Sequence, residues 1–247
     1  MGWIIAQAEH VGGRREQQDR NLARISHDEQ RCWLVVADGM GGHSGGAMAA
    51  QAVVDSALQL WNATDEGLSI NEPPAFLWQF FTTAQLNITL IAQQQRLDPH
   101  STCVAAYLTN KEGWFTHLGD SRLYHCRQNH FLHRTKDHSF VQMLVDLGKI
   151  REEEMATHRE QNSLYQGLGG NKDRDIELEI KHALVQQGDG FLLCSDGFWG
   201  NITHPEIEQL FKQPAHLQTN LSNAVNDAVQ RGGMHCDNVS AIAAMFL

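Results

Sequence analysis

The sequence predicts an α+β fold in which antiparallel β-sheets are covered by helices. Strand-like segments come in consecutive groups, whereas a parallel α/β sheet would alternate strands and helices one by one. The two long helical segments also follow one another directly. The 247 residues are 42% hydrophobic, enough for a well-buried core. No Ser/Gly/Pro-rich or like-charge run marks a linker, so we expect a single domain over residues 1–247.

Strands are expected where short apolar or alternating runs stand between turn-forming residues. The expected ranges are 3–9, 20–26, 32–37, 102–108, 113–118, 122–127, 130–133, 176–180, 190–194 and 239–246.

Helices are expected where apolar residues recur at a spacing of three to four. The first long helix follows the glycine-rich turn 41–46, with an apolar face of Met48, Ala49, Ala52, Val53, Ser56, Ala57 and Leu60. The second spans 75–95, with inward positions Phe76, Phe80, Ala84, Leu86, Ile88 and Ile91. Shorter helices are expected at 138–147, 152–158, 205–211 and 217–230.

Charge and cysteine content narrow the functional classes. The net charge of −10, from 19 basic and 29 acidic residues, argues against a nucleic-acid binder, whose footprint is a basic face. The N-terminus lacks the features of a signal peptide, and no apolar run could span a bilayer. We therefore expect a cytoplasmic protein without membrane contact. The odd number of cysteines without a Cys-x-x-Cys pair argues against a disulfide frame. Four of the five, in or beside apolar strand-like runs, are expected to be reduced core thiols: Cys32, Cys103, Cys126 and Cys194.

Four aspartates, each beside a glycine or an asparagine, carry the strongest functional signal. They are Asp38, Asp120, Asp196 and Asp237, and three of them stand at the end of an apolar, strand-like run. Carboxylates at strand ends, with glycine letting the backbone turn, suit a hard divalent cation, which prefers oxygen ligands. Any one of them alone can equally be a turn residue. All four in one chain favour a metal site.

A fifth carboxylate completes an ordered pattern. Asp19 ends the segment Gly12-Gly13-Arg14-Arg15-Glu16-Gln17-Gln18-Asp19. With the four aspartates that follow, the chain resembles the metal-dependent protein Ser/Thr phosphatases of the PPM family (type 2C), over residues 3–246. The Asp38-Gly39 turn is followed by Met40-Gly41-Gly42-His43. This form of the motif resembles the bacterial branch of the family. The resemblance implies a four-layer αββα sandwich, two antiparallel sheets flanked by helical pairs, with a metal cleft at one end.

The resemblance also implies the cofactors. Two Mn²⁺ or Mg²⁺ ions would be held by Asp19, Asp38, Asp196 and Asp237 and by the carbonyl of Gly39, and Asp120 would support a third ion. Two such ions can generate a hydroxide from bridging water and neutralise phosphoryl charge, so no side-chain nucleophile is required. Consistent with this, the sequence has no Cys-x5-Arg loop. A tight turn remains the alternative role for Asp120.

Two residues are candidates for contact with the phosphate. Arg14 occupies the position of the family's phosphate-binding arginine, and a guanidinium fork suits a phosphoryl group. Arg15 could take that role instead, and an exposed strand-end charge is the plain alternative. His43 could protonate the leaving group, as could a metal-bound water, or it is only a residue at the start of a helix.

The implied function is hydrolysis of phosphoserine and phosphothreonine in proteins. Residues 148–162 resemble the family's flap beside the cleft, and residues 135–139 would tie it to the sheet. A solvated helix with charge pairs four residues apart is the alternative for residues 148–162. Phosphorylated proteins are the expected substrates, and an opposing Ser/Thr kinase is the expected partner. The alternatives are a metal-dependent phosphoesterase for small molecules or nucleotides and a non-catalytic phosphoprotein-binding module.

Overall fold

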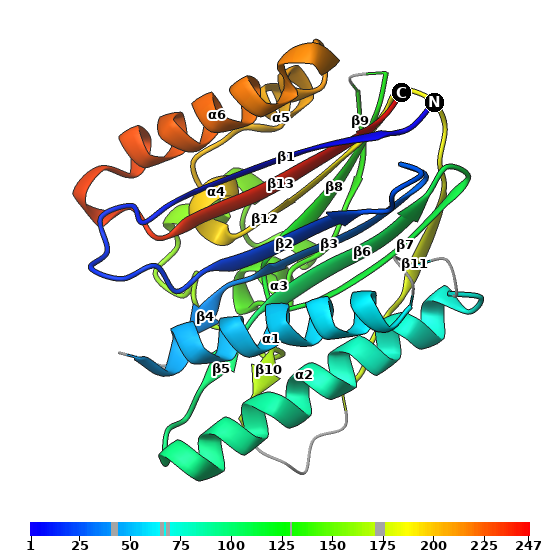
Figure 1. Ribbon diagram of the computed structural model, residues 1–247. Helices are drawn as coiled ribbons and strands as arrows, with labels where there is room; N and C mark the ends of the chain where they lie inside the picture. The colour runs from blue at the N-terminus through cyan, green and yellow to red at the C-terminus, as the bar shows by residue number, and fades with distance from the viewer. Residues whose placement is uncertain (41–43, 65–66, 68–69, 129, 171–175) are drawn as a thin grey trace.

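A computed structural model describes residues 1–40, 44–64, 67, 70–128, 130–170 and 176–247. It has four layers, in which two large antiparallel sheets lie face to face and helices cover both outer faces (Figure 1). This confirms the expected α+β sandwich. In the described residues, none of the helices combines the length and apolar character needed to span a membrane.

The first sheet has five antiparallel strands and contains both ends of the chain. Its strands lie in the order β1 (Trp3–His10), β13 (Val239–Phe246), β12 (Asp189–Cys194), β8 (Arg122–Arg127) and β9 (His130–Arg134).

The second large sheet also has five antiparallel strands. Their order is β11 (Lys181–Leu184), β7 (Glu112–Leu118), β6 (Cys103–Thr109), β3 (Arg31–Ala37) and β2 (Arg20–Ile25). A small third sheet joins β10 (Leu168–Gly169), β5 (His100–Ser101) and β4 (Gly39–Met40). These three two-residue strands were not predicted, because segments so short carry no periodic signal.

The helices form the outer layers. The two long helices, α1 (Ser44–Ala63) and α2 (Pro73–Gln95), cover the second sheet. The first sheet is covered by α4 (Asp196–Trp199), α5 (His204–Leu210) and α6 (Leu217–Gly232). The remaining helical segments are α3 (Phe140–Asp146) and the 3₁₀ turns η1 (Glu152–Thr157), η2 (Pro214–His216) and η3 (Gly233–His235).

Three apolar clusters fill the spaces between the layers. Strand β3 shows how the alternation of side chains divides them. Trp33 and Val35 face the helices α1 and α2, whereas Leu34 and Val36 face the other sheet. The third cluster packs α4, α5 and α6 against the first sheet. The four cysteines expected in the core are buried, and Cys236, for which no core position was expected, is buried as well.

Two expectations about local structure were wrong. Leu86 was expected to point inward, but its side chain is 57% exposed, because it lies on the outer side of α2. Residues 176–180 form no strand: their alternating apolar side chains pack against the core, but ladder pairing begins only at Lys181. The short helix expected at 152–158 is present as a 3₁₀ helix over Glu152–Thr157.

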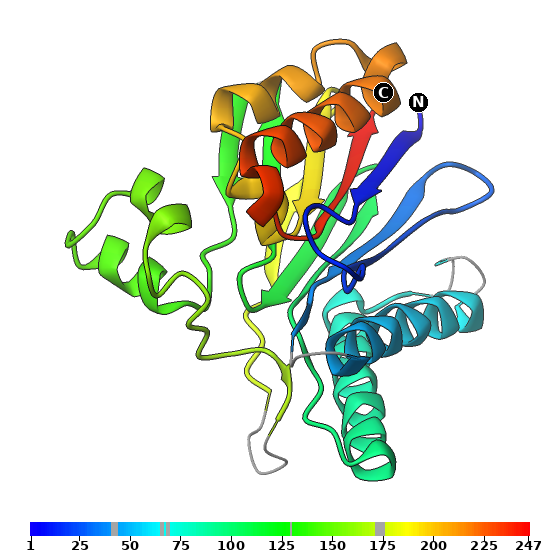
Figure 2. The same cartoon turned by 90° about the vertical axis from the view of Figure 1, so that its left-hand side faces the viewer.

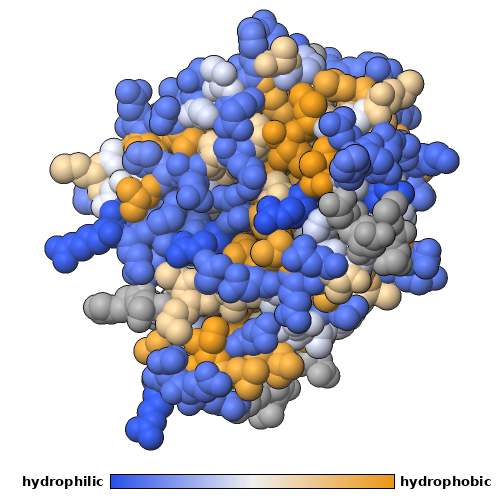
Figure 3. Space-filling view, viewed as in Figure 1, coloured by the Kyte–Doolittle hydropathy of each residue, from blue (hydrophilic) through white to orange (hydrophobic). Residues whose placement is uncertain are grey.

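The segment from α3 to η1 projects from the side of the sandwich (Figure 2). Apolar side chains also gather on the outer surface of the α1–α2 layer (Figure 3). On α2, Trp78, Leu86 and Leu90 are among the exposed large apolar residues.

Candidate metal and phosphate site

Sheet register brings the five aspartates to one end of the sandwich. Arg20 pairs with Ala37, so Asp19 and Asp38, which adjoin these residues, lie at the same end of the β2–β3 pair. In the other sheet Cys194 pairs with both Ala241 and Arg122. The nearby turns that carry Asp196, Asp237 and Asp120 therefore lie at one end of that sheet.

Close backbone packing closes the N-terminal turn against the turn that holds Asp237. Gly12 has a positive φ of 63°, and an added Cβ would lie 2.1 Å from the carbonyl oxygen of Asp237. Only glycine fits there without strain. The Asn238 side chain bonds the same turn, accepting from Gln18 N at 2.7 Å and donating to Val11 O at 2.8 Å.

Burial and mutual repulsion raise the pKa values of four of the carboxyl groups. Burial, together with repulsion from neighbouring carboxylates, raises the pKa of Asp19 to about 8 and that of Asp196 to about 7. The pKa of Asp38 lies well above its ordinary value because of burial and the charges of Asp19 and Asp196. The pKa of Asp120 is raised for the same reasons, with Asp196 the main charged neighbour. Acidic groups that oppose one another in this way are stabilised by a bound cation.

Two oxygen atoms at the centre of the cluster lack partners. Asp19 Oδ1 and Asp196 Oδ1 are buried without a hydrogen bond. Such atoms are costly unless something binds them, and carboxylate oxygens are the ligands that Mg²⁺ and Mn²⁺ prefer. The donor set therefore fits a hard divalent cation in chemical type. Among the described residues, however, no three His, Cys, Asp or Glu side chains already stand in an arrangement that could hold a metal ion.

Arg14 reaches into the same cluster. Its Nη2 lies 2.6 Å from Asp237 Oδ2, and this ion pair raises the pKa of the guanidinium. Asp196 and Asp38 contribute to the same shift. The Arg14 side chain remains 56% exposed, so it stands at the edge of the cluster with access to solvent. Arg15 is also exposed, but it is Arg14 that contacts a candidate ligand.

Gly39 lies where the first long helix begins. A Cβ on Gly39 would stand 2.1 Å from the carbonyl oxygen of Gly46, so α1 packs directly onto the Asp38-Gly39 turn. The main chain of Asp38 is held by Thr102, with Thr102 N donating to Asp38 O at 2.8 Å and Asp38 N donating to Thr102 Oγ1 at 3.1 Å. His43, the candidate general acid, lies outside the described residues.

Asp120 lies in the turn between β7 and β8, and only 5% of its surface is exposed. The turn alternative placed a bond between Asp120 and Ser121 or Arg122. Instead, the guanidinium of Arg122 is bound by Asp137, at 2.7 Å from both carboxylate oxygens. Ser121 Oγ lies 2.7 Å from Thr102 Oγ1. Ser121 and Arg122 are thus bonded to other residues, and Asp196 is the main charged neighbour of the Asp120 carboxylate.

Residue patterns did not identify the side chains that hold the aspartates in place. Ser195 Oγ donates to Asp19 Oδ2 at 2.7 Å, and Asn238 and Thr102 fix the neighbouring turns. Ser195 and Asn238 stand directly beside Asp196 and Asp237 in the sequence. Their position beside the aspartates was the only signal in the sequence. It does not show which distant segment the side chain of Ser195 or Asn238 forms a hydrogen bond with.

This fold, with acidic turns gathered at one end of the sandwich, defines a class of metal-dependent phosphatases, and the sequence comparisons agree. The sequence model of the family described as protein phosphatase 2C matches residues 6–230. The chain therefore belongs to the protein phosphatase 2C family. It is 29% identical over 232 residues to the serine/threonine phosphatase stp of Listeria monocytogenes, covering 92% of this chain and 90% of the relative.

Solved structures show the same fold. The serine/threonine phosphatase of S. agalactiae superposes with a TM-score of 0.84 at 27% identity, covering 99% of this chain and all of that one. The catalytic domain of PstP, solved in complex with two manganese ions, has a TM-score of 0.80 at 26% identity, covering 98% of this chain and 97% of that one.

Proposed function

We propose that this protein is a metal-dependent protein serine/threonine phosphatase that uses Mn²⁺ or Mg²⁺. The observation that carries the proposal is the convergence of Asp19, Asp38, Asp196 and Asp237, with buried, unpartnered oxygens on Asp19 and Asp196. Membership of the protein phosphatase 2C family and the two manganese ions of PstP support it.

In this proposal the four aspartates and the Gly39 carbonyl hold two ions. When bound, the ions supply a nucleophile from water and positive charge for the phosphoryl oxygens. Binding requires ionised carboxylates, so it is coupled to proton release from Asp19 and Asp196, whose pKa values are raised.

Arg14 would then bind the phosphoryl group of the substrate. Its guanidinium Nη2 is paired with Asp237 Oδ2 at 2.6 Å. A cation bound at Asp237 would compete for the carboxylate and so weaken the ion pair with Arg14. The exposed Arg14 guanidinium could then turn toward an incoming phosphate. Arg14 thus links metal binding to substrate binding.

The substrates would be phosphorylated proteins, and a Ser/Thr kinase would supply them. We place the protein in the cytoplasm, which fits five free, buried cysteines.

A substrate panel tests this function against the phosphoesterase alternative. The protein, loaded with Mn²⁺, is assayed on a phosphothreonine peptide, a phosphoserine peptide and a nucleoside monophosphate at equal concentration. We expect kcat/KM to be highest for the phosphopeptides. A preference for the nucleotide would support the small-molecule phosphoesterase, and binding of phosphopeptide without turnover would support the non-catalytic module.

A further inference from the structure

Trp199 connects two of the candidate metal-binding turns. It is the last residue of α4, whose first residue is Asp196. Its indole Nε1 donates to the backbone carbonyl oxygen of Asp120 at 2.9 Å. Four residues of helix therefore join a ligand of the core pair to the turn of the candidate third-ion ligand.

The indole is itself held from the other side. The guanidinium of Arg122 lies over its ring, with Cζ 3.5 Å from the ring centroid, a cation–π contact. Arg122 is fixed by the bidentate pair with Asp137, and its Nη1 donates to Tyr124 Oη at 3.2 Å. Arg122 and Asp137 are only 3% and 1% exposed. A buried bidentate pair has little freedom to move, so it fixes the plane on which the indole rests.

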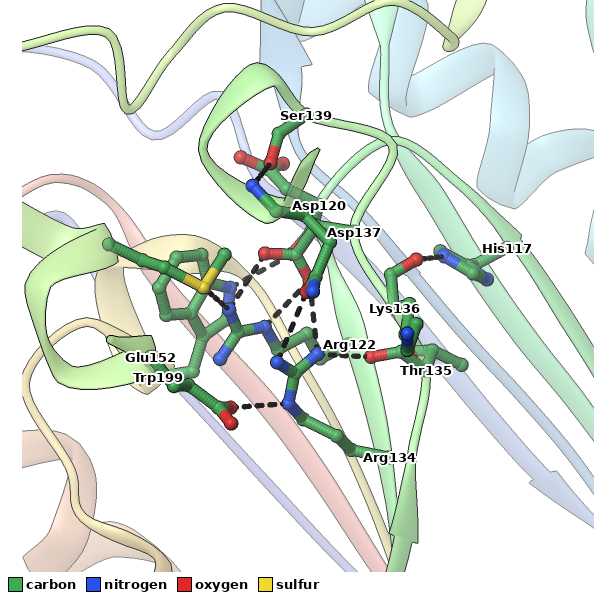
Figure 4. A network of polar contacts seen from close by, with 12 residues as sticks. His117, Asp120, Arg122, Arg134, Thr135, Lys136, Asp137, Ser139, Glu152 and Trp199 are labelled. Carbon is green, nitrogen blue, oxygen red and sulfur yellow. Dashed lines mark hydrogen bonds and ion pairs between the residues drawn. The ribbon is translucent and has the colours of Figure 1, made fainter. Parts of the chain in front are cut away.

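This arrangement also touches the projecting segment (Figure 4). Arg122 Nη2 lies 3.7 Å from the sulfur of Met155, a fully buried residue of η1. Arg134 Nε pairs with Glu152 Oε1 of η1 at 2.5 Å, and Arg134 Nη1 lies 3.8 Å from Asp137 Oδ1. Contacts thus run from η1 through Arg122 to Trp199 and the Asp120 turn.

We propose that Trp199 and Arg122 are positioning residues for Asp120: they hold its turn against α4, so that the Asp120 carboxylate faces Asp196 across a site for a weakly bound third divalent cation. The proposal rests on the function proposed above. Asp196 is the main charged neighbour of Asp120, and a cation bound between two buried carboxylates would relieve the repulsion between them.

The chain offers a matched control for the indole. Trp33 also donates its Nε1–H to a backbone carbonyl oxygen, that of Ala57, at 3.2 Å. It lies in the core under α1, away from the acidic turns. Trp33→Phe and Trp199→Phe therefore remove the same kind of hydrogen bond, and only the second bond reaches Asp120.

The test counts bound ions directly. The two-ion protein is titrated with Mn²⁺, and free Mn²⁺ is followed by electron paramagnetic resonance for wild type, Trp199→Phe, Trp33→Phe, Asp120→Asn and the double variant Trp199→Phe/Asp120→Asn. We expect Trp199→Phe to weaken the third binding step by about three- to tenfold, as for loss of one hydrogen bond. The first two steps should not change, and Trp33→Phe should bind all ions as wild type does. Trp199→Phe should add nothing in the Asp120→Asn background.

Four results would overturn the proposal. These are wild-type third-ion affinity in Trp199→Phe, an additive effect in the double variant, equal weakening of all three steps, and a wild-type protein that binds only two ions. Equal weakening would mean that Trp199 supports α4 as a whole. None of these results touches the function proposed above, which fails instead if the two-ion wild type does not hydrolyse phosphopeptides.

Discussion

Ser195 Oγ donates a 2.7 Å hydrogen bond to Asp19 Oδ2, while Asp19 Oδ1 is buried without a partner. One oxygen is thus held by the protein, and the other is oriented but unsatisfied. Ser195 also accepts from Ser240 N at 3.0 Å, which ties the contact to strand β13. The scaffold pre-orients this carboxylate for a ligand at the expense of the metal-free state.

Removing a carboxylate should therefore affect stability and activity in opposite directions. In Asp196→Asn, we expect the metal-free protein to melt about 2–4 °C higher than wild type, the shift that 1 kcal/mol produces in a chain of this length. The reason is the raised pKa of Asp196, which reflects an unfavourable buried charge. Turnover should fall at least about a hundredfold, since a metal ligand is lost. Calorimetry in chelator and a phosphopeptide assay in Mn²⁺ measure the two effects, and wild-type turnover would remove Asp196 from the site.

The metal-free protein should lose stability as the pH rises. The pKa of Asp19 is about 8 and that of Asp196 about 7 in the folded chain, against an ordinary value near 4. Between about pH 4 and pH 8 the folded state holds more protons than the unfolded state, so the free energy of unfolding falls through this window. Urea unfolding in chelator at pH 5.5, 7 and 8.5 measures the slope. Asp19→Asn should flatten it, and a wild-type stability that rises with pH would contradict the assignment.

Arg14→Ala should raise KM for a phosphopeptide with a smaller effect on kcat. Loss of one charge-assisted contact costs about 1.5–3 kcal/mol, or about 10- to 150-fold in KM. Arg15→Ala, which removes an exposed neighbouring charge, is the control. If only the Arg15 variant shows a raised KM, the phosphate contact belongs to Arg15.

Asp120→Ala should lower kcat about tenfold or more if Asp120 supports a third ion during the chemical step. The two tighter ions should stay bound, because Asp120 stands in a separate turn from their ligands. Melting temperature, bound metal and kcat measured on one preparation separate this from a turn role. A lowered melting temperature with unchanged kcat would make Asp120 a structural residue only.

The sequence was sufficient to predict most of the fold because the central strands are short apolar runs that stand between turn-forming residues. In β3 one face packs against the helices and the other against the facing sheet, so residues 32–37 form a continuous apolar run bounded by polar residues. Residues 176–180 show the limit of this reasoning, since their alternation reflects packing at an edge without backbone pairing. Leu86 shows another: an apolar residue on a long helix can face solvent, and only the partner layer decides its direction.

Some features of the candidate site could also be predicted from the sequence, and others could not. The aspartates are predictable because each stands beside a turn residue at or near the end of an element, a local feature. Their convergence and the partner of Arg14 depend on sheet register. The contact from Trp199 to Asp120 joins residues 79 positions apart, and nothing in either segment specifies it.

The most direct test of the central claim joins metal binding to turnover in one sample. The metal-free protein is titrated with Mn²⁺, and bound ions and phosphothreonine-peptide hydrolysis are measured at each step, with Asp38→Asn as the matched variant. We predict no turnover in excess chelator, a rise in turnover as two ions bind, and neither tight binding nor turnover in Asp38→Asn. Full turnover in excess chelator, or a phosphorylated form of the enzyme trapped during the reaction, would contradict the account.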